Sequence, residues 1–270
     1  MWLVKLLIGL ALAYSVVVAL IFLAQTWLIF PTSLAGQGAP ALPPEAERLE
    51  LATPDGERLV GTRIPASQGH DAPRPALLGF GGNAWNADAL ALYLHHLFPE
   101  HDAIAFHYRG YSPSTGRPSA AAILDDAPRI YDYAADELAQ SGIVVVGLSI
   151  GAGPAARIAA DRSPRGTILV TPFDSLKALA QYHYPWVPVG PFLRHRMPVA
   201  DLLGRADGPV AIISAENDAI VPAARTGPVA EAARNLVFQV TLAGIGHNDL
   251  YDSSAFHEAI RHALRTIETQ

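Results

Sequence analysis

The chain has 270 residues, a formal net charge of −6 and no cysteine. This acidic balance offers no basic face for nucleic acid, which is therefore not an expected partner. Without cysteine, disulfides and thiolate metal sites are excluded, and no pair of histidines has the spacing of two ligands on one helix face. We therefore expect no metal and no cofactor.

Residues 6–24 read LLIGLALAYSVVVALIFLA and carry no charge. As a helix this run would span about 28 Å, close to the hydrocarbon thickness of a bilayer. We expect residues 1–30 to form a membrane anchor that meets lipid through 6–24. Lys5 precedes the run and favours a cytoplasmic N-terminus, with the body on the outer, periplasmic or extracytoplasmic side. A cleaved signal peptide, which would give a secreted protein, is the alternative.

Residues 31–45 are rich in Gly, Pro and Ala and are predicted to be a linker. Over 46–270 strand and helix patterns alternate, which predicts one α/β domain with a mostly parallel sheet and helices on both faces. The segment at about 176–207 interrupts the alternation with aromatic residues and prolines. It is interpreted as a small apolar cap above the site, and a surface loop packed on the domain is the alternative.

Ser149 lies in Gly147-Leu148-Ser149-Ile150-Gly151. The apolar run 142–146 precedes it and a helical pattern of small residues follows, which is the strand–turn–helix context of a G-x-S-x-G nucleophile elbow. Larger residues at the glycine positions would clash with the neighbouring strand and helix. Ser149 is the predicted nucleophile, and a tight glycine turn with an incidental hydroxyl is the alternative.

A nucleophilic serine needs a base, and the base needs an acid that fixes its tautomer. Asp218 follows the apolar strand pattern at 209–214, and His247 lies on a glycine-flanked loop after a later strand. The chain order Ser, Asp, His is that of α/β hydrolases. Glu216 and Asp174 are rival candidates for the acid.

The oxyanion hole is expected from the N–H of Ile150 and from Asn83, which follows two glycines after an early strand. Trp85 in the same loop, Tyr111 and Trp186 are the expected substrate contacts. Arg109 and Arg117 lie in the 108–119 loop. Two roles are open for them: binding an anionic headgroup, or forming a structural ion pair.

Several segments together resemble one family. They are GFGGNA at 79–84, the Y-R-G-Y stretch with S-T-G-R-P-S at 108–119, the elbow, and G-H-N-D at 246–249. The chain is similar to the α/β-hydrolase-domain serine hydrolases with an N-terminal signal anchor, the group related to protein depalmitoylases and serine-aminopeptidase-like hydrolases. The resemblance implies an α/β-hydrolase fold, carries over Ser149, Asp218 and His247 as the triad, and makes the Asn83 region the oxyanion loop.

The expected function is that of a serine hydrolase that cleaves a carboxylic ester or thioester through an acyl-enzyme. The anchor and the apolar cap point to a small-molecule or acyl-chain, lipid-like substrate. An amide- or peptide-cleaving hydrolase would use the same triad and remains an alternative. A non-catalytic, membrane-anchored binding module on the same fold is the second.

Overall fold

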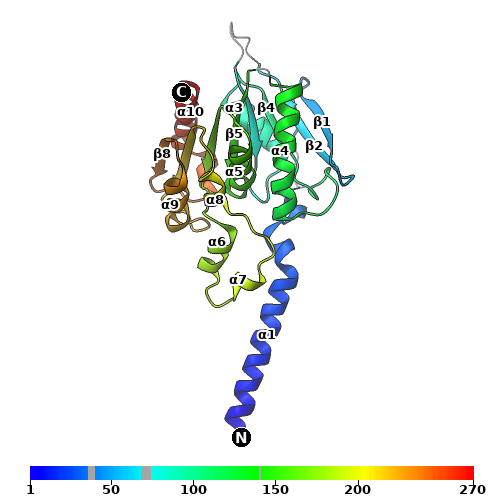
Figure 1. The fold of residues 1–270 in the computed structure, drawn as a ribbon, viewed down its shortest axis with the longest axis vertical. Coiled ribbons are helices and arrows are strands. Elements are labelled where there is room, and N and C mark those ends of the chain that lie inside the picture. Colours follow the sequence, from blue (N-terminus) through cyan, green and yellow to red (C-terminus); the bar gives the residue numbers. More distant parts are fainter. Residues whose placement is uncertain (36–39, 68–73, 140) are drawn as a thin grey trace.

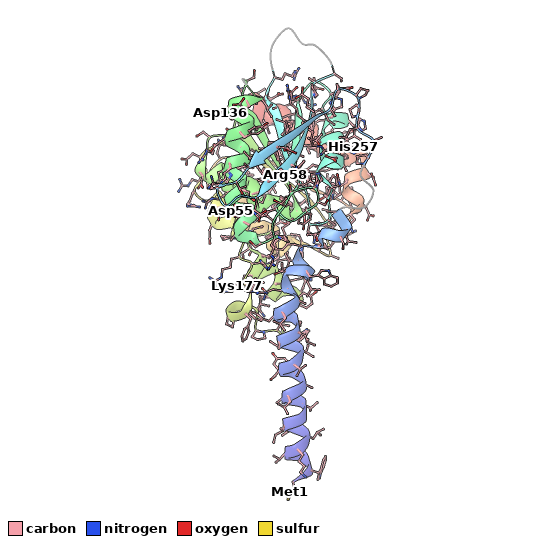
Figure 2. All side chains as sticks on the ribbon, turned by 90° about the vertical axis from the view of Figure 1, so that its right-hand side faces the viewer. Met1, Asp55, Arg58, Asp136, Lys177 and His257 are labelled. Atoms are coloured by element: carbon pink, nitrogen blue, oxygen red, sulfur yellow. The ribbon has the colours of Figure 1, made fainter. Side chains whose placement is uncertain are left out.

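A computed structural model describes residues 1–35, 40–67, 74–139 and 141–270. A 28-residue helix, α1 (Trp2–Ile29), projects from a body built on one eight-stranded sheet (Figure 1). Figure 2, turned by 90°, shows the same helix clear of the body with Met1 at its far end. The molecule therefore consists of a compact body from which α1 projects furthest.

The sheet has the order β1-β2-β4-β3-β5-β6-β7-β8. Strands β1 and β2 form an antiparallel hairpin, β2 pairs antiparallel with β4, and all later pairings are parallel. The strands are β1 (Glu47–Ala52), β2 (Arg58–Ile64), β3 (Ala76–Phe80), β4 (Ala103–Phe106), β5 (Ile143–Leu148), β6 (Gly166–Val170), β7 (Val210–Ala215) and β8 (Leu236–Leu242).

Helices cover both faces of this sheet, as the sequence predicts. Successive strand residues point to opposite faces, so Leu78 of β3 packs in one core cluster and its neighbour Leu77 in the other. The first cluster also holds apolar side chains of α4 (Ala120–Glu137), α5 (Ala152–Asp161) and α9 (Ala223–Ala232). The second holds those of α3 (Ala87–Leu97) and α10 (Ser254–Glu268).

The segment expected to be a cap divides into two parts. Its last helix, α8 (Val199–Leu203), is buried against the core through Val199, Leu202 and Leu203. The other two, α6 (Leu176–His183) and α7 (Val189–Phe192), extend from the body along α1 (Figure 1). We call α6, α7 and the loop between them the cap arm. It flanks the membrane-type helix. A cover above the serine stays a prediction.

The stretch expected to be a linker begins with a short helix, α2 (Thr32–Ala35), and its residues 36–39 lie outside the described residues. Phe30 and Ala35 are buried in the first core cluster, and Leu42 packs against the second. The described parts of this stretch are therefore attached to the body and do not form a free tether.

Helix α1 is fixed to the body at its C-terminal end. The Thr26 hydroxyl lies 2.8 Å from His195 Nε2, and Gln25 accepts a hydrogen bond from the Arg194 N–H at 2.8 Å. The ring of Phe30 meets that of His195 edge-on. Toward its N-terminus the helix is exposed, and it is long and apolar enough to cross a bilayer.

Candidate active site

Ser149 stands at the sharp turn between β5 and α5, and its backbone has φ +52°. A non-glycine residue in this region is strained and is held there by its surroundings. A Cβ on Gly147 would lie 2.5 Å from the Gly151 carbonyl oxygen, and one on Gly151 only 2.0 Å from that of Phe80. Both glycines of the G-x-S-x-G motif are thus required by close backbone approach.

Asp218 and His247 are brought together from the loops after β7 and β8. His247 Nδ1 lies 2.6 Å from Asp218 Oδ2, and both residues are buried. The other carboxylate oxygen accepts the N–H groups of Ile220 at 2.8 Å and Val221 at 2.6 Å. The carboxylate is thereby fixed, and it selects the imidazole tautomer with the proton on Nδ1, which leaves Nε2 free to accept one.

The two rival acids have other partners. Glu216 accepts the N–H of Gly244 at 2.8 Å, at the protein surface. Asp174 pairs with Arg225 at 3.1 Å and accepts the N–H of Ser175. Among the described residues, Asp218 is the carboxylate that contacts His247.

The Ser149 hydroxyl is partly exposed and has no hydrogen bond to any described residue. A catalytic serine is often not yet aligned with its base in a free enzyme, because the hydrogen bond tightens when substrate binds. The structure therefore shows the Asp218–His247 contact, and a hydrogen bond between His247 and Ser149 is expected only when substrate binds.

The loop between β3 and α3 passes next to the serine. A Cβ built on Gly82 would lie 3.9 Å from the Ser149 Cβ. Within the described ranges the N–H of Asn83 has no hydrogen-bond partner, so it is available to a ligand. Ile150, the other expected oxyanion donor, is the second residue of the turn that carries Ser149.

Two buried tyrosines hold this loop in place. The Tyr108 hydroxyl donates to the Gly81 carbonyl at 2.7 Å, and the Tyr111 hydroxyl donates to the Asn83 carbonyl at 2.9 Å. Burial raises the pKa of both phenols, so they remain protonated donors. Tyr111 is 1% exposed. Its position indicates that it supports the loop, whereas the sequence predicts a substrate contact. The two tyrosines of the Y-R-G-Y motif both bond this loop, and this shared supporting role is what the sequence analysis did not recognise.

The two expected tryptophan contacts differ in position. Trp85 flanks Gly82 and meets the rings of Tyr93 and Tyr251 edge-on, beside the serine loop. Trp186 lies in the cap arm, is 51% exposed, and accepts the Tyr14 hydroxyl of α1 on its carbonyl at 2.8 Å. Trp85 remains a candidate substrate contact, whereas Trp186 belongs to the surface beside the apolar helix.

Of the two roles considered for the arginines of the 108–119 loop, Arg109 has that of a structural ion pair. It forms a bidentate pair with Asp126, at 2.6 and 3.0 Å, and also contacts Asp55. Arg117 is exposed. In the part of the chain that the structure describes, no three His, Asp or Glu side chains form a group that could hold a metal ion.

The strand order, the serine at a strand–turn–helix elbow, and an Asp–His pair on the following loops define an α/β hydrolase. No protein-family model matches the chain. The protein Rv2307c of Mycobacterium tuberculosis is 32% identical over 262 residues, covering 94% of this chain and 92% of that protein. Protein bem46 of Schizosaccharomyces pombe is 29% identical, covering 79% and 77%. The lysophosphatidylserine lipase ABHD12 of Xenopus tropicalis is 24% identical, covering 62% and 50%.

Solved structures have the same fold. The Pyrococcus furiosus esterase Pf2001 aligns with a TM-score of 0.65 at 15% identity, covering 86% of this chain and 97% of that one. A membrane phospholipase A described as a bacterial virulence factor aligns with a TM-score of 0.63 at 13% identity, covering 100% and 99%. The chain belongs to the α/β-hydrolase family, which confirms the resemblance drawn from its motifs.

Proposed function

We propose that the protein is a membrane-anchored serine hydrolase that cleaves a carboxylic ester or thioester bearing an acyl chain. The observation that carries the proposal is the buried Asp218–His247 hydrogen bond on the loops that follow the elbow serine. A scaffold without catalysis has no need to fix a histidine tautomer in this way. The comparisons support the hydrolase class, and the residues and the substrate are our proposal.

In the proposed reaction Ser149 Oγ attacks the acyl carbonyl carbon while His247 Nε2 takes its proton. The N–H groups of Ile150 and Asn83 stabilise the oxyanion of the tetrahedral intermediate. As the bond to the leaving alcohol or thiol breaks, His247 returns the proton to that oxygen or sulfur. Water, deprotonated by His247, then attacks the acyl-serine, and His247 returns this proton to Ser149 Oγ as the bond to the acyl group breaks and the carboxylic acid leaves. Asp218 keeps the imidazole oriented and stabilises its charged form.

The choice of an acyl-chain substrate rests on the apolar surroundings of the site. Helix α1 supplies a bilayer-length apolar segment. One relative is named a lysophosphatidylserine lipase, and one structural neighbour is named a membrane phospholipase A. We place the N-terminus in the cytoplasm and the body on the outer side, because Lys5 precedes the apolar run. A reporter fused after Gln270 that is active only in the cytoplasm would reverse this orientation.

Labelling with a fluorophosphonate probe tests the nucleophile. The wild-type chain in detergent should be labelled, Ser149→Ala should not, and the exposed Ser254→Ala should be labelled like wild type. Absence of labelling in folded wild type would favour the non-catalytic binding module. The same triad serves ester, thioester and amide cleavage, so labelling alone does not distinguish these reactions. Comparing the hydrolysis rates of matched dodecanoyl oxygen-ester, thioester and anilide substrates does.

A further inference from the structure

An apolar groove of about 300 Å³ runs between α1 and the cap arm. One wall comes from a single face of α1, with residues spaced by three and four positions as in an amphipathic helix. This wall consists of Val18, Ile21, Phe22, Gln25, Leu28 and Ile29. The opposite wall is formed by the cap arm, through Ala180, Tyr184, Val187 and Phe192 among others. No residue of either wall is charged.

We propose that this groove binds the acyl chain of a membrane lipid and delivers it sideways from the bilayer to Ser149. The proposal rests on the proposed function and assigns α1 a role in substrate binding as well as in anchoring. The occupant is an alkyl chain because the groove offers apolar walls and one of them continues as a bilayer-length helix. If a methylene group occupies about 30 Å³, like a water molecule in the liquid, the groove holds on the order of ten of them.

Both walls are attached to loops of the candidate site. At the end of α1, the Ile29 carbonyl accepts a hydrogen bond from Asn83 Nδ2 at 3.4 Å. At the end of α6, the His183 ring bonds the Ile220 carbonyl at 2.8 Å, and the Ile220 N–H in turn bonds Asp218. Each wall of the groove is therefore joined at one end to a loop of the candidate site, α1 to the oxyanion loop and α6 to the acid loop.

The depth of the cap arm supports entry from the bilayer. Tyr14, which bonds the Trp186 carbonyl, lies about 22 Å along the helix from Ile29. A 28-residue helix of about 42 Å exceeds a hydrocarbon core of about 30 Å by only about 12 Å. Tyr14 would then lie about 10 Å inside the lipid, or about 15 Å inside if the hydrocarbon begins at residue 24, so the tip of the cap arm would enter the lipid.

The surface chemistry of the cap arm fits this depth. Its exposed large hydrophobic side chains are all aromatic, the type enriched at membrane interfaces: Tyr182, Tyr184, Trp186 and Phe192. A loop carbonyl in lipid also needs a partner from the protein, and Tyr14 supplies one to Trp186. Lys177, at the start of α6, lies where α1 leaves the body (Figure 2) and can remain at the headgroup level.

Blocking the groove from each wall tests the proposal. We choose Ala180→Trp on the cap arm and Val18→Trp on α1, with Ala178→Trp and Leu20→Trp as controls. Ala178 lies in a separate, open hollow beside α6, and Leu20 is exposed on the opposite side of α1. The measured quantity is the ratio of kcat/KM for a dodecanoyl ester to kcat/KM for a butanoyl ester, with the full-length chain in detergent micelles.

The groove variants should lower this ratio at least tenfold, because the long chain alone needs the groove, and the controls should keep it within twofold. An unchanged ratio in both groove variants, or an equal fall in the controls, would overturn the proposal.

A second measurement does not depend on catalysis. Ser149→Ala protein in phosphatidylcholine vesicles is illuminated with a fatty acid that carries a diazirine at mid-chain. Crosslinks should map to both walls of the groove and should decrease in Ala180→Trp. Crosslinks confined to the exposed side of α1, or between two copies of the chain, would reject the groove as an acyl site. If wild type hydrolyses no ester while the groove is still labelled, the proposed reaction fails and the lipid site stands.

Discussion

The hydroxyl of Tyr111 donates to the backbone carbonyl of Asn83, the residue whose own N–H is free to face a ligand. This hydrogen bond orients the peptide unit that follows Asn83. The preceding unit, which contains the Asn83 N–H, is held through the Gly82 carbonyl, which accepts the Trp85 N–H at 3.1 Å. Because a backbone N–H can stabilise an oxyanion only when it is held in position, this contact connects the Y-R-G-Y motif to the proposed oxyanion loop.

Tyr111→Phe should therefore lower kcat by about five- to tenfold and destabilise the fold by about 1 kcal/mol, since it removes one partly buried hydrogen bond. The KM for a short ester should change little. Tyr133→Phe is the control, because its hydroxyl has no partner among the described residues. Full kcat in Tyr111→Phe would show that the loop keeps its geometry without the phenol.

Asp218→Asn should reduce kcat by roughly 10³- to 10⁴-fold, because an amide no longer holds the tautomer with the proton on Nδ1. The matched controls are Glu216→Gln and Asp174→Asn, which should stay within about threefold of wild type. Steady-state hydrolysis of a butanoyl ester makes the comparison, with thermal unfolding as the folding check. If kcat fell further in either control than in Asp218→Asn, the residue changed in that control would be the catalytic acid instead of Asp218.

Gly151→Ala should prevent folding or destabilise the protein by more than about 3 kcal/mol, because its Cβ would lie 2.0 Å from the Phe80 carbonyl oxygen. Gly204→Ala provides the comparison. Its Cβ would meet the Ala200 carbonyl at 3.4 Å, an ordinary contact, and its backbone is helical. Its free energy of unfolding should change by less than about 1 kcal/mol. Denaturant unfolding in detergent measures both.

Acid stability should depend on Asp88, in the first turn of α3. Burial raises its pKa, but the nearby His107 ring, at 3.4 Å, and hydrogen bonds from Thr62 and Arg48 outweigh burial and hold that pKa well below the usual value. A lowered native pKa means that this contribution is present above the unfolded pKa of about 3.9 and is lost as pH falls through the native pKa.

Asp88→Asn should destabilise the protein by about 2–4 kcal/mol at pH 7 and flatten the fall in unfolding free energy below about pH 4. The exposed Asp207, paired with Arg234, is the control. Its Asn variant should change stability by less than about 1 kcal/mol and keep the wild-type pH dependence. Denaturant unfolding at several pH values decides, and an equal acid response in both variants would contradict the assignment.

The fold class could be predicted because its signals are local. The run before Gly147, the glycines around Ser149 and the alternation of apolar strands and helices each reflect steric needs of a few neighbouring residues. The same holds for Asn86, which caps α3 by accepting the Asp88 N–H at 2.8 Å.

The cap arm and α1 show what sequence patterns leave out. The hydrogen bond between Tyr14 and Trp186 joins residues 172 positions apart, and nothing in either segment alone specifies the other as its partner. Likewise, whether Tyr111 meets substrate or supports a loop depends on where its hydroxyl ends, which only the packed structure decides.

The attachment of α1 to the body through Gln25, Thr26 and Phe30 has a kinetic consequence. A protein tethered by a loose chain would sample every tilt above the lipid plane, but this joint leaves little freedom to rotate. In the proposed membrane-anchored protein the candidate site is held at one height and one orientation relative to the bilayer, so encounters with a lipid substrate reduce to diffusion in two dimensions. Turnover should then follow the mole fraction of substrate in the surrounding leaflet more closely than its bulk concentration.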